Sequence, residues 1–179
     1  LALVALGTAQ ADPLAKDVFG HTPGPTGGAP AAIGFYSKGC VSGAVQLPET
    51  GPSWQAMRLS RGRNWGHPEL VSFLMGLSQA AQQAGWQGLY IGDMSQPRGG
   101  PMLTGHASHQ VGLDADIWLT PMPNRRFTNQ AREDVSAVSM LQPNSLYVDQ
   151  KKWTASRTAL LKHAASYPQV ERLFVHPGI

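Results

Sequence analysis

Cysteine is almost absent from this sequence, which contains only Cys40 among its 179 residues. One cysteine has no partner within the chain, so a framework of intrachain disulfides is excluded. Charged residues are also sparse, at 14% of the chain, and the net charge is only +3. Lysine and arginine are scattered, with adjacent pairs only at 125–126 and 151–152. This distribution argues against a nucleic-acid-binding surface.

Long apolar runs are missing as well. No segment approaches the roughly 18 consecutive apolar residues that a membrane-spanning helix requires. The short apolar run at 1–6 is followed by Ala9-Gln10-Ala11, which has the form of a signal-peptidase site. We therefore expect residues 1–11 to be the remnant of a signal peptide on an exported, soluble protein, with an ordinary flexible N-terminus as the alternative.

What the chain does contain is typical of a loop-rich globular domain. Hydrophobic residues make up 42% of it, and there are 20 glycines and 14 prolines. Glycine and proline are densest at 21–30, so residues 12–34 are expected to form an extended lead-in. Residues 35–179 are long enough for one buried core and are expected to form a single domain.

Local patterns predict a small number of helices and strands. Apolar residues recur at helical spacing after Pro68, and Gly85 provides a stop. The alternation around Asp114 and Asp116 is that of a half-buried strand, which would point both carboxylates to one face. The expected helices are at 68–84 and 154–165, and the expected strands at 89–91, 113–119 and 172–176. This pattern favours an α+β fold with a small central antiparallel sheet flanked by helices.

The residues with chemical potential are concentrated in one stretch, 105–116, which contains two imidazoles and two carboxylates. On a straight strand His109 and Asp116 would lie roughly 23 Å apart, too far to share an ion bound at about 2 Å. A bend at Gly112 would bring them together, because glycine tolerates backbone angles that other residues avoid. Nitrogen and oxygen donors then suit zinc. Spacing alone leaves open a surface histidine beside two carboxylates that bind nothing.

The sequence around these residues resembles a known motif. The stretch Ser-His-Gln-Val-Gly-Leu-Asp-Ala-Asp-Ile at 108–117 resembles the zinc-ligand signature of the LAS metallopeptidases. One branch of that group, the penicillin-insensitive murein endopeptidases, is similar to this chain over residues 33–179. The shared motifs, in order, are Gly39-Cys40, Met57-Arg58, Gly66-His67-Pro68, Ile91-Gly92-Asp93-Met94, Gly105-His106-Ala107-Ser108-His109 and Leu173-Phe174-Val175.

The resemblance implies a periplasmic zinc endopeptidase that hydrolyses D-alanyl to meso-diaminopimelate cross-links in peptidoglycan. It implies zinc ligation by His109 and Asp116. His106 would belong to an accessory metal or support a ligand, with a plain structural role as the alternative. Arg58 and Asp93 would contact the peptide's carboxylate or amine, with helix or turn anchoring as the alternative. A homodimer is also compatible with it.

One motif of the family is absent from this sequence. In the family, the third zinc ligand and the catalytic base come from an H-x-H motif downstream of the segment similar to 173–179. No H-x-H occurs in this sequence, so it offers no identifiable catalytic base. We therefore expect an incomplete copy of a longer chain. The family's base would lie beyond Ile179, and a partner for Cys40 would be missing with it.

Other roles are considered for the same residues. A relative that binds peptidoglycan without cutting it is the main alternative function. A two-histidine, one-carboxylate iron site of an oxygenase is a third, disfavoured by the crowding of the histidines and by export. His67 is expected to cap a helix, His163 to lie on the surface, and His176 to be structural. Asp114 would either orient the site or bond to nearby backbone.

Overall fold

The computed structural model describes residues 12–179, so the expected signal-peptide remnant lies outside the described residues. The chain contains both helices and strands, and the expected α+β class is confirmed. In chain order the elements are α1 (Ala15–Gly20), β1 (Ala31–Phe35), β2 (Lys38–Ser42), β3 (Val45–Gln46), β4 (Trp54–Ala56), the 3-10 helix η1 (Leu59–Arg61), β5 (Trp65–Gly66), α2 (Pro68–Gln83), β6 (Leu89–Ile91), β7 (Ile117–Trp118), α3 (Asn129–Asp134) and α4 (Ala155–Ala165).

The strands form three small sheets. The pairs β1–β2 and β3–β5 are antiparallel, whereas the central sheet has the order β4-β6-β7. In that sheet β4 pairs with β6 in parallel and β7 pairs with β6 antiparallel, so it is mixed rather than wholly antiparallel as expected. The parallel pair arises because α2 provides the crossover between β4 and β6.

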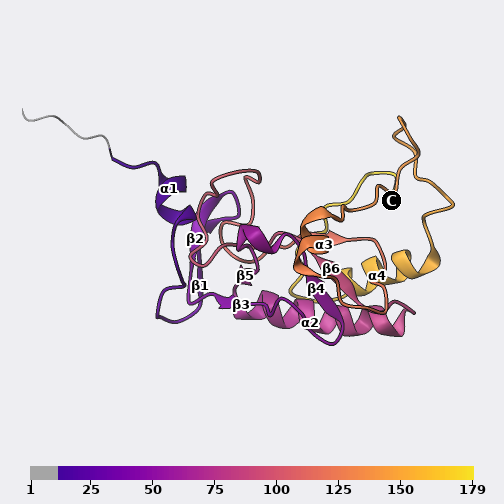
Figure 1. Cartoon of the computed structure of the whole chain (residues 1–179), viewed down its shortest axis with the longest axis horizontal. Coiled ribbons are helices and arrows are strands. Elements are labelled where there is room, and N and C mark those ends of the chain that lie inside the picture. The colour runs from indigo at the N-terminus through magenta and orange to yellow at the C-terminus, as the bar shows by residue number, and fades with distance from the viewer. Residues whose placement is uncertain (1–11) are drawn as a thin grey trace, which may run out of the picture.

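Helix α2 is the main support of the central sheet, and its predicted bounds are confirmed. His67 is the N-cap and its side chain accepts the Glu69 N–H, while Pro68 takes the first helical position. Gly85, at φ 86°, lies just past the end. Figure 1 shows α2 running along one side of the molecule beneath the strands. Its apolar face is buried, as predicted, through Leu70, Leu74, Leu77 and Ala81.

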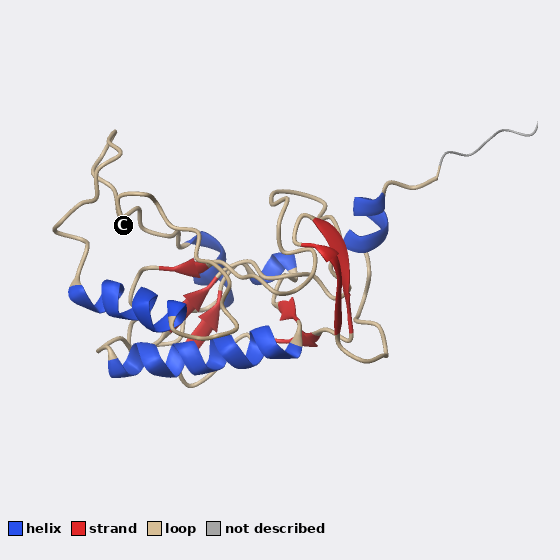
Figure 2. Cartoon of the chain, turned by 180° about the vertical axis from the view of Figure 1, so that it is seen from behind, coloured by secondary structure: helices blue, strands red, loops and turns tan. Residues whose placement is uncertain are grey.

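The core joins this face of α2 to the sheet and to α4. Leu89 and Ile91 of β6 are fully buried in the same cluster, together with Leu160 of α4. Seen from behind, the two longer helices lie side by side, with α2 along the bottom of the view, whereas the β1–β2 hairpin stands at the opposite end of the molecule from the chain's C-terminal end (Figure 2). At about 25 cal/mol per Å² of apolar area, such burial is the dominant stabilising term.

Several sequence expectations need correction. The strand expected at 113–119 is only two residues long, because residues 113–116 have no regular structure, although Asp116 keeps two backbone hydrogen bonds beside the sheet. Residues 172–176 form no strand, because no strand of the described residues 12–179 pairs with this segment, and Phe174 is largely exposed. The lead-in at 12–34 has no regular structure at 23–30 but also contains α1 and most of β1. The segment 121–150, left unassigned, contains α3.

The other expected helix is confirmed at its predicted position, as α4. Thr154 precedes it, but its side chain bonds Ser156 and Arg157 rather than a free backbone N–H. Across residues 12–179, none of the helices has the length and apolar character needed to span a bilayer.

Candidate metal centre

The loop at 105–112 is fixed in place by one buried side chain, Gln110. Its Oε1 accepts the Gly39 N–H at 3.2 Å, and its Nε2 donates to the carbonyls of Ser37 at 2.9 Å and Ala107 at 3.1 Å. The Gly100 N–H donates to the Gln110 carbonyl at 3.0 Å. The loop is therefore held between the β1–β2 hairpin and the 96–101 segment.

Two left-handed residues turn the chain back on itself within this loop. His109 has φ 66° and Gly112 has φ 69°. Glycine adopts this conformation without penalty, whereas at His109 it is strained. The Asp114 carboxylate accepts the His109 N–H at 3.2 Å and so supports the strained residue. The bend predicted at Gly112 is confirmed.

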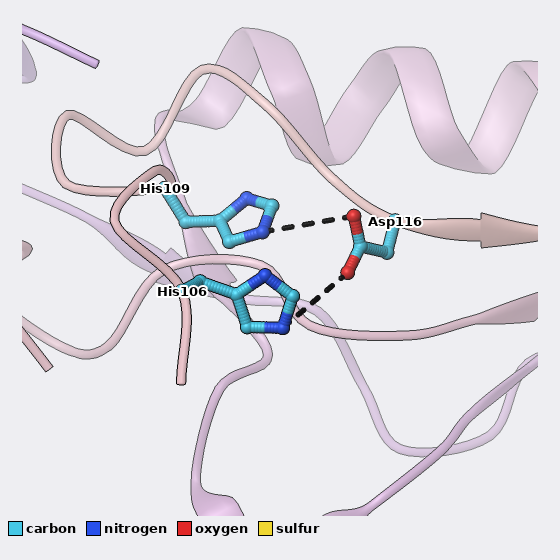
Figure 3. Close-up of side chains that lie close together, drawn as sticks. All are labelled: His106, His109 and Asp116. Atoms are coloured by element: carbon cyan, nitrogen blue, oxygen red, sulfur yellow. Dashed lines mark ion pairs between the residues drawn. The ribbon is translucent and has the colours of Figure 1, made fainter. Parts of the chain in front are cut away.

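This turn brings three side chains together, His106, His109 and Asp116 (Figure 3). His109 Nε2 lies 3.7 Å from Asp116 Oδ1, and His106 Nε2 lies 3.7 Å from Asp116 Oδ2. One ligand atom from each residue can be chosen so that all lie within 4.8 Å of one another. The widest separation must shorten slightly for one ion at about 2.0–2.2 Å from each donor.

His109 is the most buried member of the cluster. Its side chain is 3% exposed, and its Nδ1 lies 2.8 Å from Asp114 Oδ2. Its Nε2 is buried and has no hydrogen-bond partner among the described residues. A buried polar atom without a partner is costly, so an ion facing this nitrogen would satisfy a group that the described residues leave unpaired. The donor set therefore fits a divalent cation.

The electrostatics of His109 favour a positive charge at this position. Burial lowers the pKa of His109, but hydrogen bonding and charge from Asp114 and Asp116 outweigh burial and raise the pKa to about 10. Metal-free protein therefore holds a proton on His109 at neutral pH. A metal ion must displace that proton before it can bind the ring.

Asp116 lies on the solvent-accessible side of the cluster. Its N–H donates to the Asp93 carbonyl at 2.9 Å and its carbonyl accepts the Gly92 N–H at 2.8 Å, which extends the β6–β7 pairing. Its side chain remains 45% exposed. Burial raises the pKa of Asp116, but interaction with His109 and the charges of His106 and Arg61 bring that pKa below its usual value. The carboxylate is thus ionised and accessible.

Asp93 lies next to the cluster and is almost completely buried, with its side chain 2% exposed. Its Oδ2 lies 2.8 Å from Arg61, 2.8 Å from Arg63 and 3.2 Å from His106 Nε2. Arg58 lies over the Trp118 ring at 5.6 Å and donates to the Arg132 carbonyl at 3.3 Å. A substrate contact by Arg58 or Asp93 stays a prediction.

No sequence motif points to Arg61 and Arg63, although both contact Asp93 beside the candidate centre. They stand two apart in Arg61-Gly62-Arg63, a spacing that contains no catalytic signature. Their contact with Asp93 is visible only in the fold, where both guanidinium groups meet one carboxylate oxygen.

The histidines outside the centre are placed as expected. His67 caps α2, His163 is exposed on α4, and His176 Nδ1 accepts the Gly178 N–H in a local turn. Ile179 belongs to the same turn, since its N–H donates to the His176 carbonyl at 2.9 Å, and its aliphatic side chain offers no metal-ligand or catalytic atom. No catalytic base is identified in the described part of the chain, and the base expected beyond Ile179 stays a prediction.

The chain is similar to proteins of one known family. Residues 32–179 match the family described as penicillin-insensitive murein endopeptidase. A protein of that name from Haemophilus influenzae is 40% identical over 152 residues, which cover 85% of this chain and 53% of that protein. Namesakes from Klebsiella pneumoniae and Pectobacterium atrosepticum are each 38% identical, over 100% and 87% of this chain and over 65% and 55% of their own lengths.

The chain thus spans between about half and two thirds of the length of these relatives. The matched region includes the whole candidate centre, from Arg61 to Asp116, and extends to the last described residue. On the extent of this match, the chain belongs to the penicillin-insensitive murein endopeptidase family.

Proposed function

We propose that this chain contributes the zinc-binding centre of an endopeptidase that hydrolyses D-alanyl to meso-diaminopimelate cross-links in peptidoglycan. The observation that supports it most directly is the buried Nε2 of His109, which has no hydrogen-bond partner within residues 12–179 and faces Asp116 beside His106. The names of the relatives, murein endopeptidases, point to the same substrate polymer. A peptidoglycan substrate implies action in the periplasm.

The proposed ligands are His109, Asp116 and His106. Two imidazole nitrogens and a carboxylate oxygen are donors typical of catalytic zinc, which keeps a further position open for water. Bound zinc would polarise the scissile carbonyl and lower the pKa of bound water to about 7. The same donor types also suit iron, so metal identity is part of the test.

The chain's own residues would orient these ligands. The Asp114 carboxylate, 2.8 Å from His109 Nδ1, would hold a proton on that nitrogen and leave the Nε2 lone pair free for the metal. The partly exposed Asp116 would keep the centre open to a peptide. A general base that accepts the proton of the attacking water is also required, and no H-x-H is present to provide it.

The test measures metal content and muropeptide release together. Both are measured for the 179-residue chain and for the protein encoded by its whole natural reading frame, with purified peptidoglycan as substrate. His109→Ala and Asp116→Ala are compared with His163→Ala, which removes an exposed imidazole on α4. We expect stoichiometric zinc in the parent and control, its loss in the two site variants, and cross-link cleavage that depends on zinc.

Other outcomes would contradict the proposal. Zinc-loaded protein from the whole reading frame that sediments with cell walls but releases no muropeptides would favour a non-catalytic binding relative. Iron that zinc cannot replace would favour redox chemistry. Equal metal content in the parent and in His109→Ala would show that the metal does not bind at the candidate centre.

A further inference from the structure

Arg61 presents a positive charge beside the candidate centre that the proposed chemistry does not use. Its side chain is 43% exposed, whereas the neighbouring Arg63 is almost buried. Both guanidinium groups bind the same oxygen, Oδ2 of Asp93, at 2.8 Å. Asp93 accepts one hydrogen bond from each guanidinium group, so the exposed Arg61 keeps further N–H donors for an additional anion.

Arg61 is also close to the proposed metal ligands. Asp93 Oδ2, which accepts its hydrogen bond, lies 3.2 Å from His106 Nε2, and that nitrogen lies 3.7 Å from Asp116 Oδ2. The positive charge of Arg61 is one of the influences that lower the pKa of Asp116. An anion bound to Arg61 would therefore lie next to the metal and not on a remote surface.

The backbone gives Arg61 a fixed direction. It ends the 3-10 helix η1, which is flanked by left-handed residues at Arg58, φ 59°, and Gly62, φ 60°. The Arg61 N–H donates to the Arg58 carbonyl at 3.0 Å. Glu133 accepts the Ser60 N–H and hydroxyl, each at 2.9 Å, and ties the turn to α3. Together with the Asp93 contact, these bonds preorganise the guanidinium.

The remaining hydrogen-bonding capacity of Arg61 suits a carboxylate. A guanidinium has five N–H donors in a planar fork that matches the two oxygens of a carboxylate. Among the described residues, Asp93 is the one side-chain acceptor recorded for Arg61. By contrast, Arg58 lies on Trp118 and donates to Arg132 and Ser136, so its donors face the protein.

We propose that Arg61 binds the free carboxylate next to the scissile bond of the peptide, with Asp93 as its positioning residue. This inference depends on the proposed function. In a D-alanyl to meso-diaminopimelate cross-link, the carbon bonded to the scissile nitrogen carries a free carboxylate. That negative charge reaches the centre whenever the scissile carbonyl approaches the metal, and a fixed guanidinium there would select for it.

The test compares cross-linked muropeptides in which this carboxylate is free or amidated. The parent protein from the whole reading frame is compared with Arg61→Gln, Arg61→Lys and a control, Arg172→Gln, which removes an exposed guanidinium paired with Glu171. We expect the parent and control to prefer the free carboxylate by roughly ten- to hundredfold in kcat/KM. Arg61→Gln should show no preference, Arg61→Lys a reduced one, and all should bind equal zinc.

Equilibrium binding of the same two muropeptides is measured in parallel, so Arg61 is tested even if no protein cleaves them. Cleavage by the parent without preference, or a preference that persists in Arg61→Gln, would overturn the role of Arg61 and leave the proposed function intact. Absence of cleavage together with a binding preference that Arg61→Gln abolishes would support Arg61 while refuting the endopeptidase.

Discussion

Metal-free protein is expected to lose stability as the pH rises, because the proton on His109 is held more tightly in the folded chain than in the unfolded one. The pKa of His109 is about 10 in the fold, against 6.5 for an unperturbed histidine. A raised pKa in the folded state gives stability that is fully present below about 6.5 and is lost as the pH rises through about 10. Within that window each pH unit removes at most about 1.4 kcal/mol from the free energy of unfolding.

The assay is urea unfolding of chelator-treated protein across this window. His109→Gln is the control, because it keeps a polar side chain but cannot titrate, and lysine and tyrosine titration affects both proteins alike. The parent curve should fall relative to the control curve as the pH rises. Saturating zinc should remove the fall from the parent curve, since a metal-bound imidazole has already lost its proton. Parallel curves for the two chelated proteins would refute the assigned charge state of His109.

Three further substitutions test the site and the core. Asp114→Asn should weaken zinc binding roughly 10- to 100-fold in a chelator competition assay, because it removes the negative charge that orients His109 through Nδ1; unchanged affinity would contradict this role. Leu74→Ala should lower the free energy of unfolding by about 2–5 kcal/mol in urea, whereas Met75→Ala, at a more exposed position of the same helix, should have little effect. Gly99→Ala should destabilise the protein and reduce its zinc content, since φ is 66° and a Cβ would lie 2.0 Å from the Gln110 carbonyl oxygen; normal zinc content with normal stability would exclude that clash.

Helix α2 could be predicted from the sequence because every signal for it is local. A cap at His67, Pro68 at the first position, an apolar face and Gly85 past the end all agree within one segment. The strand expected at 113–119 is longer than the observed one, because its alternating pattern does not reflect local strand structure alone. Its alternation comes partly from carboxylates that turn toward His109, and Leu113 is half exposed rather than buried in a ladder.

Some contacts of the candidate site could likewise be predicted from the sequence, and others could not. His109 and Asp116 are separated by a short turn whose glycine is visible in the sequence, so their approach could be inferred. The contact of Arg61 and Arg63 with Asp93 joins residues about thirty positions apart through the packing of η1 beside the end of β6. No spacing rule connects such residues, because their separation is set by the path of the intervening helix α2.

All three proposed ligands lie within eleven consecutive residues, 106–116, on one side of the core. A cross-link that closes so short a loop removes little entropy from the unfolded chain, whereas one that joins distant segments removes more. Bound metal would therefore stabilise this domain by mass action on a site already shaped by Gln110 and Asp114, rather than by joining its layers. Chelation should free the 105–116 segment for amide hydrogen exchange while α2 and the central sheet keep their protection.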